Sequence, residues 1–346
     1  MTKHTQKGIS ITSVGSNTPS YYLLKVVWKT VRTLLMICMT FVILYPLFYM
    51  ISMAFRPVED VFNPQIIWVP DSFTIDNIVT TVKTIDYLGL LGNTIFLSVT
   101  STVIQLFITA LIGYGFGRFP QRIFRFSLKN VLLILVILTF IVPAQQVAIP
   151  THNLFADIDL FGIIRGGKKI INAVAGLFGA DLALDASTGL SLLSKPVLFF
   201  ILALFGQGIR SGLFILVFMQ AFSSMPQELE DAALVDGTGF VRTYFQVMLP
   251  NVRTVLIIMG LFSLVWYWND YYLTSIYLSE STLSTVLANL RAAFERSDMG
   301  IGAADIYQMV VMEQSACLLT ITPLLLFYLL TQRFFTESIE RTGIVG

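Results

Sequence analysis

The feature that most limits how this chain can fold is a series of apolar segments long enough to cross a lipid bilayer. A helix of about 20 apolar residues spans the roughly 30 Å of hydrocarbon. Hydrophobic residues make up 55% of the chain and charged residues only 12%, which is far from the composition of a soluble domain. Because backbone in contact with lipid must satisfy its own hydrogen bonds, such segments fold as helices. The sequence therefore predicts an all-α integral membrane protein.

Six segments have the length and composition of transmembrane helices. The third contains Pro143 and Pro150, and we expect a break there. The region 156–190 holds an apolar stretch too short to cross, so we expect an excursion on the outer side with an interfacial helix. The predicted spans are residues 33–55, 93–114, 131–149, 196–222, 252–277 and 314–335.

The distribution of basic residues predicts the orientation of these spans. The N-terminal tail, residues 1–32, is basic and has no acidic residue, and the loop after the second span is also basic without an acid. Cytoplasmic loops carry such an excess of Lys and Arg. Six crossings then place the C-terminal tail, residues 336–346, and the loop 225–250 in the cytoplasm as well.

The loop 225–250 lies between two spans and is dense with helix signals. Ser224 and Gln227 have the spacing of a capping box, Gly237 supplies a stop, and Pro250 closes the unit. The sequence predicts a short helix, a sharp turn and a second short helix. Unlike the other cytoplasmic segments this loop is acidic, which favours contact with a basic partner surface over a position on lipid.

Several residues of this loop are similar to the EAA loop in the membrane subunits of bacterial ATP-binding-cassette importers. The family pattern reads Glu-Ala-Ala, Gly, Ile and Leu-Pro. The chain keeps its intervals with Asp in place of Glu and Val in place of Ile. The matching residues are Asp231, Ala232, Ala233, Gly237, Val247, Leu249 and Pro250.

Other motifs resemble the maltose-type carbohydrate permeases and follow that family's order. They are PQIIWVPDSFTIDN (64–77), GYGFGRFP (113–120), VPAQQVAIP (142–150), WND (268–270) and the tail 332–346. The resemblance covers most of residues 33–346. It implies the fold of a type I importer permease with a cytoplasmic coupling helix, and it implies the shorter of the two permeases of a sugar importer.

The resemblance also implies partners and a location. The partners are a second homologous permease in a heterodimer, two ATPase subunits that bind ATP and Mg²⁺, and an extracytoplasmic solute-binding protein. The location is a bacterial inner membrane. The residues expected to couple the chain to the ATPases are Glu228, Glu230, Asp231, Ala232, Ala233, Asp236, Gly237 and Pro250.

The sequence gives no sign of a metal, redox or nucleotide site. Its cysteines and histidines are isolated, and its net charge of +1 favours no nucleic acid. Gly162, Gly167 and Lys168 imitate a phosphate loop, but Lys169 stands where Ser or Thr must bind Mg²⁺. We therefore expect no ATPase site and no cofactor on this chain.

A group of polar and aromatic residues near the outer end of the fifth span is the candidate lining of a solute pathway. Asp270 lies about 27 Å along this span at about 1.5 Å per residue, which favours a structural or gate-lining role over a proton relay. Arg210, in the fourth span, is costly to expose to lipid and should face a cavity, a carboxylate or a partner subunit. The candidate pathway residues are Trp266, Trp268, Asn269, Asp270 and Tyr271.

Two alternatives remain open for the transported solute and the energy source. The same architecture could carry a polyamine or a phosphate ester. An ion-driven secondary transporter would need acidic residues at the bilayer midplane or broken helices in paired repeats, and the sequence shows neither.

Overall fold

The computed structural model consists of helices joined by short connections, and its described residues contain no β-sheet. It describes residues 19–61, 63, 69–118, 128–159, 163–177, 191–193, 195–279, 281–295 and 306–343. Parts of the N-terminal tail, the 64–77 and 113–120 motifs, the 156–190 excursion and the C-terminal tail therefore lie outside the described residues.

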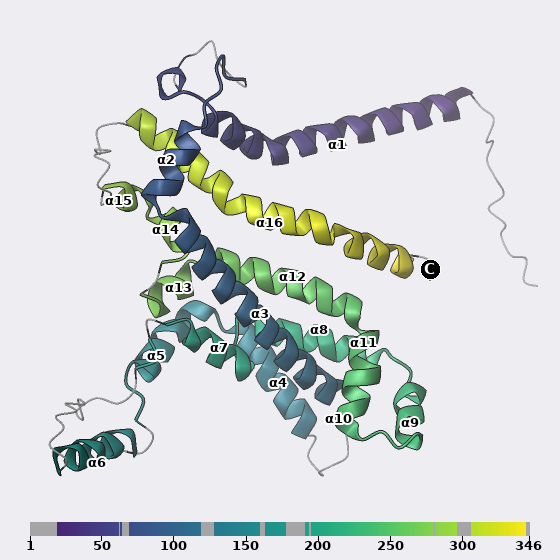
Figure 1. Ribbon diagram of the computed structural model, residues 1–346. Coiled ribbons are helices and arrows are strands. Elements are labelled where there is room, and N and C mark those ends of the chain that lie inside the picture. Colours follow the sequence, from purple (N-terminus) through teal and green to yellow (C-terminus); the bar gives the residue numbers. More distant parts are fainter. Residues whose placement is uncertain are drawn as a thin grey trace, which may run out of the picture.

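The helices follow one another along the chain as Figure 1 shows. They are α1 (Pro19–Ala54), η1 (Val58–Asp60), α2 (Asp76–Thr84), α3 (Tyr87–Arg118), α4 (Leu128–Ile141), α5 (Ala144–Ala156), α6 (Ile163–Leu177), α7 (Val197–Leu204), α8 (Ser211–Ser223), α9 (Glu228–Val235), α10 (Phe240–Thr243), the π-helical turn η3 (Tyr244–Met248), α11 (Leu249–Asn251), α12 (Arg253–Asn269), α13 (Tyr272–Tyr277), α14 (Leu283–Ala288), α15 (Leu290–Glu295) and α16 (Ile306–Gly343).

Among the described residues, α1, α3 and α16 are each long and apolar enough to cross a membrane. Two bent helix pairs raise the number to five if each pair is one span. The first pair, α4 and α5, bends by 99° next to Pro143, where we expected a break; Pro150 lies inside α5. In the second pair, α10–α11 and α12 meet at 78° just after Pro250, which closes the loop as expected.

The structure differs from the expected continuous fourth span. Helix α7 ends at Leu204 and α8 begins at Ser211, so residues 205–210 form a break between them. The backbone is left-handed at Gly206, with φ of +70°, and at Arg210, with φ of +55°. A helix cannot continue through left-handed residues, which explains the break.

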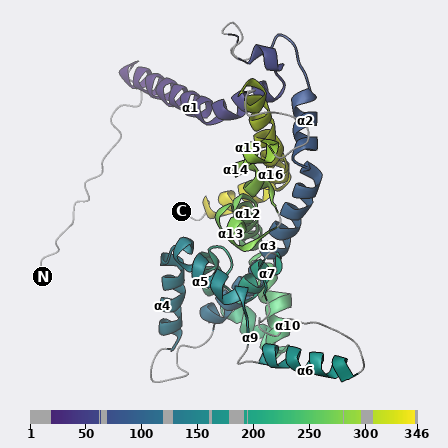
Figure 2. The ribbon, with the colours of Figure 1, turned by 90° about the vertical axis from the view of Figure 1, so that its left-hand side faces the viewer.

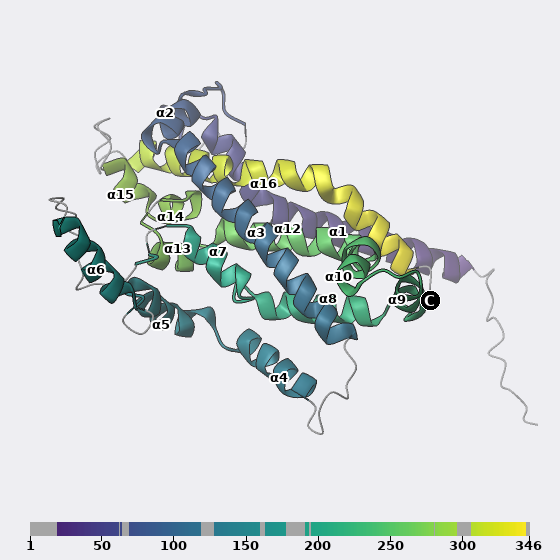
Figure 3. The ribbon, with the colours of Figure 1, turned by 60° about the horizontal axis from the view of Figure 1, so that its bottom comes forward.

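Helix α3 is the centre of the bundle, packed against α7, α8 and α12. It approaches α8 closely at Gly113, which has no Cβ. A Cβ added there would lie only 2.5 Å from the Cβ of Phe218. The face of α3 toward its neighbours carries polar groups, including Ser98 and Gln105, which are fully buried. In Figure 3, α3 crosses the middle of the molecule beside α8.

Two helices extend away from this bundle. Helix α1 packs against α16 at one end only, and none of its most apolar stretch is buried in the chain. Helix α6 stands apart from the body beyond α5 in Figure 1, and in Figure 2 it lies at the lower edge of the view. It occupies part of the region where we expected an interfacial helix.

The loop α9–α11 lies on the same side of the molecule as the amino end of α1 and the carboxyl end of α16 (Figure 1). Helices α2, α13, α14 and α15 lie at the opposite end. The described ends of α1 and α16 therefore lie on one side of the molecule with the loop α9–α11.

Candidate functional site: the coupling loop and the helix break

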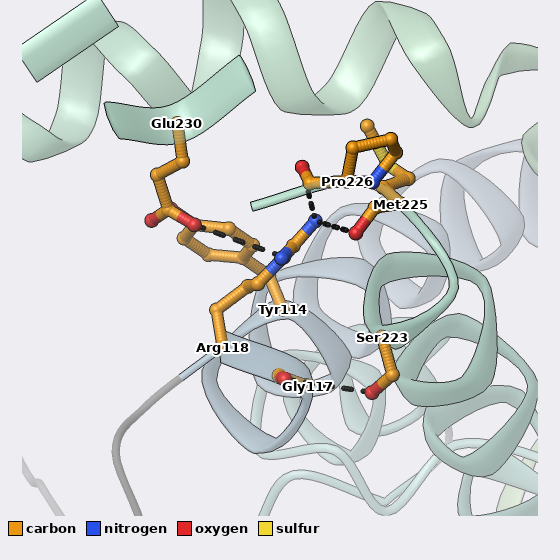
Figure 4. A network of polar contacts seen from close by, with 7 residues as sticks. All are labelled: Tyr114, Gly117, Arg118, Ser223, Met225, Pro226 and Glu230. Carbon is orange, nitrogen blue, oxygen red and sulfur yellow. Dashed lines mark hydrogen bonds and ion pairs between the residues drawn. The ribbon is translucent and has the colours of Figure 1, made fainter. Parts of the chain in front are cut away.

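Helix α9 is held at the end of the bundle by polar contacts with the last turn of α3 (Figure 4). The hydroxyl of Tyr114 donates to Oε1 of Glu230 at 2.5 Å, and Nε of Arg118 lies 3.7 Å from Oε2 of the same carboxylate. Nη2 of Arg118 also donates to the carbonyl oxygens of Met225 at 2.8 Å and Pro226 at 3.4 Å. One guanidinium therefore contacts both α9 and the connection that leads into it.

The start of α9 differs from the expected capping box. The hydroxyl of Ser224 donates to the carbonyl of Ala221 at 2.8 Å, because Ser224 still belongs to the end of α8. Helix α9 begins four residues later at Glu228, and Gln227 is its N-cap without a side-chain hydrogen bond. Pro226 precedes the helix and is not in its first turn.

The end of α9 is confirmed at Gly237, which has a left-handed φ of +78°. The backbone N–H of Gly237 bonds Leu234, and that of Thr238 bonds Ala233 at 3.1 Å, which is a Schellman motif. The Thr238 hydroxyl also contacts the hydroxyl of Thr243 at 2.9 Å, which ties α9 to α10. Residues 228–251 therefore form two short helical segments joined by a hydrogen-bonded turn at Gly237, and we call this unit the elbow.

Most predicted coupling residues lie on the outer surface of this elbow. Ala233 is buried and Glu230 is turned toward α3, whereas the other members are exposed. The exposed members are Glu228, Asp231, Ala232, Asp236, Gly237 and Pro250. The matched loop residues are therefore divided between a face toward the bundle and a face toward solvent.

A layer of aromatic side chains packs between the elbow and the helices of the bundle. The ring of Tyr114 lies 5.1 Å from Tyr244, 5.3 Å from Phe222 and 5.3 Å from Phe240. Tyr114 and Tyr244 are almost fully buried. Because these rings come from α3, α8, α10 and η3, the aromatic layer joins the loop to two of the bundle helices.

The break between α7 and α8 is held by a closed ring of hydrogen bonds. Nε2 of Gln105 donates to the carbonyl of Ile209 at 2.8 Å. The backbone N–H of Ile209 donates to the Tyr267 hydroxyl at 3.2 Å, and that hydroxyl donates to Oε1 of Gln105 at 2.7 Å. The ring needs glycine at position 208, where a Cβ would lie 2.5 Å from Oε1 of Gln105. Nonhelical backbone at membrane depth requires such partners.

Arg210 follows this ring and is exposed on the surface of the chain. Its guanidinium carbon lies 4.9 Å from the centre of the Trp266 ring, an attractive cation–π contact. No carboxylate of the described residues forms a salt bridge with it. Of the three environments expected for Arg210, a carboxylate within the described part of the chain is excluded.

The structure separates the predicted pathway residues into two groups. Trp266 is half-buried, and Asn269 and Tyr271 are exposed. Trp268 is buried, with its indole N–H donating to the Thr320 carbonyl at 3.2 Å, so it holds α12 against α16. Asp270 accepts hydrogen bonds from the backbone of α13, including the Thr274 N–H at 2.9 Å. Trp268 and Asp270 therefore have structural contacts, whereas the other three remain accessible.

Sequence reasoning did not assign roles to several residues that build these two regions. Tyr114 and Arg118 lie within a motif used only for its resemblance, although their spacing of four places them on one face of a helix. Gln105 was missed, although a glutamine inside an apolar span is a signal of a buried polar contact.

Comparison with known proteins agrees with this architecture. Residues 110–339 match the family described as "Binding-protein-dependent transport system inner membrane component". The sn-glycerol-3-phosphate transport system permease protein UgpE of Pectobacterium atrosepticum is 26% identical over 250 residues, which is 72% of each chain. The inner membrane ABC transporter permease protein YcjP of Escherichia coli K12 is 23% identical over 305 residues, 88% of this chain and 91% of the relative.

A solved structure shows the same fold. It is a crystal structure of a bacterial ABC transporter involved in the import of the acidic polysaccharide alginate. One of its chains is similar with a TM-score of 0.62 and 17% identity, covering 93% of this chain and 100% of that one. The predicted all-α permease fold is thereby confirmed. The chain belongs to the inner membrane components of binding-protein-dependent transport systems and is a permease subunit of an ABC importer.

Proposed function

We propose that this chain forms half of the translocation pathway of a carbohydrate importer and that α9 receives the motion of separate ATPase subunits. The observation that carries the proposal is the outward face of α9. Glu228, Asp231 and Asp236 are exposed there beside Val235, which is 87% exposed. Exposed apolar side chains with charged neighbours are typical of a protein interface.

The proposed assembly contains a second related permease, two ATPase subunits and an extracytoplasmic binding protein. ATP and Mg²⁺ would be held by the ATPase subunits. The most apolar stretch of α1 has no cover within the chain, so either lipid or the second permease would cover it. The match to binding-protein-dependent systems supports the external component.

The proposed orientation places both termini and α9 in the cytoplasm. The basic tail before α1 supports it by the positive-inside rule. The amino end of α1 and the carboxyl end of α16 lie on the same side of the molecule as α9, which supports it as well (Figure 1). ATP-driven closure of the ATPases would then shift the spans between inward-open and outward-open states.

The proposed substrate is a carbohydrate. The similar solved structure belongs to an importer of an acidic polysaccharide, which supports a sugar. Tyr271 offers an exposed aromatic ring of the kind on which sugar rings stack, and Asn269 offers a hydrogen-bonding amide, whereas the ring of Trp266 is half-buried and contacts Arg210. Because a relative is named for sn-glycerol-3-phosphate, this phosphate ester belongs in the substrate test.

The coupling role is tested by charge reversal in the complete importer, reconstituted in vesicles. Asp231→Lys should leave the protein in the membrane but lower ATP-driven uptake at least about tenfold, since coupling free energies of 1–3 kcal/mol correspond to about 5–150-fold. Asp71→Lys makes the same charge change at an exposed position outside the loop and is the matched control. Equal uptake by the two variants would refute the coupling role of α9.

The substrate is tested in the same vesicles with labelled neutral sugars, acidic sugars and glycerol 3-phosphate. We expect ATP-dependent uptake of at least one sugar, and saturation by the solute that the binding protein holds. Uptake of glycerol 3-phosphate alone would replace the carbohydrate with a phosphate ester. Uptake without ATP that stops with an ionophore would refute an ATP-driven importer.

A further inference from the structure

We propose that Tyr114, Arg118 and Glu230 form a latch that transmits the motion of α9 to α3, with Glu230 acting inside the chain and not at the ATPase surface. This inference rests on the proposed coupling function. It assigns the three residues as positioning residues.

The carboxylate of Glu230 is already engaged within the chain. Its two oxygens face Tyr114 and Arg118, and its side chain is only 16% exposed. Asp231, the next residue, is exposed. The two adjacent acids therefore point to different partners, one toward α3 and one away from the bundle.

The apolar side chains of helix α9 are mostly only partly buried, so its polar contacts are part of what attaches it to the bundle. Ala233 is its one buried residue. Leu229, Leu234 and Val235 are 40%, 50% and 87% exposed. Hydrophobic burial stabilises a helix by about 25 cal/mol for each Å² removed from water, so these partly buried side chains supply part of the packing of α9 against α10 and η3. The attachment of α9 to α3 includes the hydrogen bond and the ion pair of Glu230.

The latch is placed where a charged contact retains strength. The side chain of Arg118 is 10% exposed, so its attraction to Glu230 is screened less than that of a surface pair. The hydrogen bonds to Met225 and Pro226 fix the same guanidinium. Removing Glu230 would leave a largely buried cation with fewer partners.

The helix that receives the motion is stiffly joined to its neighbour. The missing Cβ at Gly113 lets α3 contact the backbone of α8, and the Ser223 hydroxyl donates to the Gly117 carbonyl at 3.4 Å (Figure 4). A displacement of α9 that moves Arg118 should therefore move α3 and α8 together. In this way two helices of the bundle can follow one short cytoplasmic helix.

The test uses Glu230→Gln, Tyr114→Phe and their double variant in the full importer reconstituted in vesicles. Three quantities are measured: co-purification of the ATPase subunits, the rate of ATP hydrolysis, and solute transported per ATP hydrolysed. We expect unchanged co-purification and continuing hydrolysis, with about tenfold less solute per ATP in Glu230→Gln, within the range of measured coupling free energies. Tyr114→Phe removes the hydrogen bond but leaves the pair of Glu230 with Arg118, so it should lower the ratio less than Glu230→Gln does. The losses of the two changes should not add in the double variant, because both alter the contacts of one side chain.

The matched control is Gln246→Ala, which removes an exposed hydrogen bond from Arg242 at 2.9 Å in the same loop and should leave the ratio unchanged. Loss of ATPase co-purification in Glu230→Gln would make Glu230 an ATPase contact and overturn the latch while leaving the proposed function intact. An unchanged ratio, or additive losses in the double variant, would also overturn it. Failure of the proposed function is distinguishable, since the unmodified importer would then show no ATP-driven uptake.

Discussion

Helices α7 and α9 end in the same backbone motif but lie in different surroundings. After each helix a left-handed glycine, Gly206 or Gly237, closes a Schellman motif with the preceding turn. The break after α7 lies inside an apolar segment and is held by a neutral ring of amide, hydroxyl and backbone groups. Helix α9 lies at the end of the bundle and is held by a carboxylate and a guanidinium.

This difference follows the cost of charge at each depth. A charged group in the bilayer centre costs about 2.5–3.5 kcal/mol on insertion scales, whereas neutral polar groups can satisfy one another there. At the end of the bundle, closer to water, a charge costs less, and Arg118 and Glu230 pair there with side chains that are 10% and 16% exposed. Helix α3 serves both regions, with Gln105 at the break and Arg118 at the latch.

The largest effect is expected from breaking the neutral ring. Gln105→Leu would leave the Ile209 carbonyl without its donor and the proton of the Tyr267 hydroxyl without its acceptor, although that hydroxyl would still accept from the Ile209 N–H. The expected cost is about 1–3 kcal/mol for each unsatisfied group. Thermal unfolding of the purified protein should show a clear loss of stability and a lower folded yield. Gln146→Leu, a change at an exposed glutamine in α5, is the control. Equal stability of the two variants would show that the ring does not hold the break.

Replacing Gly206 or Gly237 by alanine compares the two helix ends directly. We expect an intermediate loss of stability. A left-handed backbone costs a residue with a Cβ roughly 1–2 kcal/mol. At Gly206 the added Cβ would also lie 3.1 Å from Cδ1 of Ile112, whereas at Gly237 nothing lies within 4 Å. Gly206→Ala should therefore lower the unfolding temperature more than Gly237→Ala. A larger decrease in Gly237→Ala would show that packing around Gly206 adds no strain to the alanine variant.

Gly237→Ala has a second expected readout. Because Gly237 sets the angle of the elbow, we expect its alanine variant to reduce solute uptake more than its small loss of stability predicts. Gly237→Asn, which tolerates left-handed backbone better, should recover part of the uptake. Equal uptake by the alanine variant and the unmodified chain would show that the elbow tolerates a different geometry.

The smallest effect on stability is expected at Arg210. Its side chain is exposed and its cation–π contact with Trp266 is worth about 0.5–1 kcal/mol at such a site. Arg210→Gln should therefore unfold close to the temperature of the unmodified protein, while uptake of acidic sugars falls more than uptake of neutral sugars. A large loss of stability would instead place Arg210 in an essential contact of the assembly.

The sequence predicted the elbow more accurately than the fourth span. Gly237 and Pro250 mark the ends of local structure, and local signals act over a few residues, so both predictions were confirmed. The capping box at Ser224 was wrong because α8 extends to that serine and uses its hydroxyl. The break at 205–210 has a local signal in Gly206, but glycine is also frequent in continuous transmembrane helices. The side chains that hold the break, Gln105 and Tyr267, lie more than 50 positions away in sequence, so the break was missed.

The sequence by itself determined the all-helical membrane character, the acidic elbow between two spans and the resemblance to importer permeases. Apolar length, charge distribution and turn residues are local properties, so they can be read from the chain in order. Only the tertiary structure showed that Glu230 turns toward α3 while Asp231 remains exposed, and that Trp268 is held by α16. The direction of a side chain depends on which helices surround it, and that is decided when distant segments pack together.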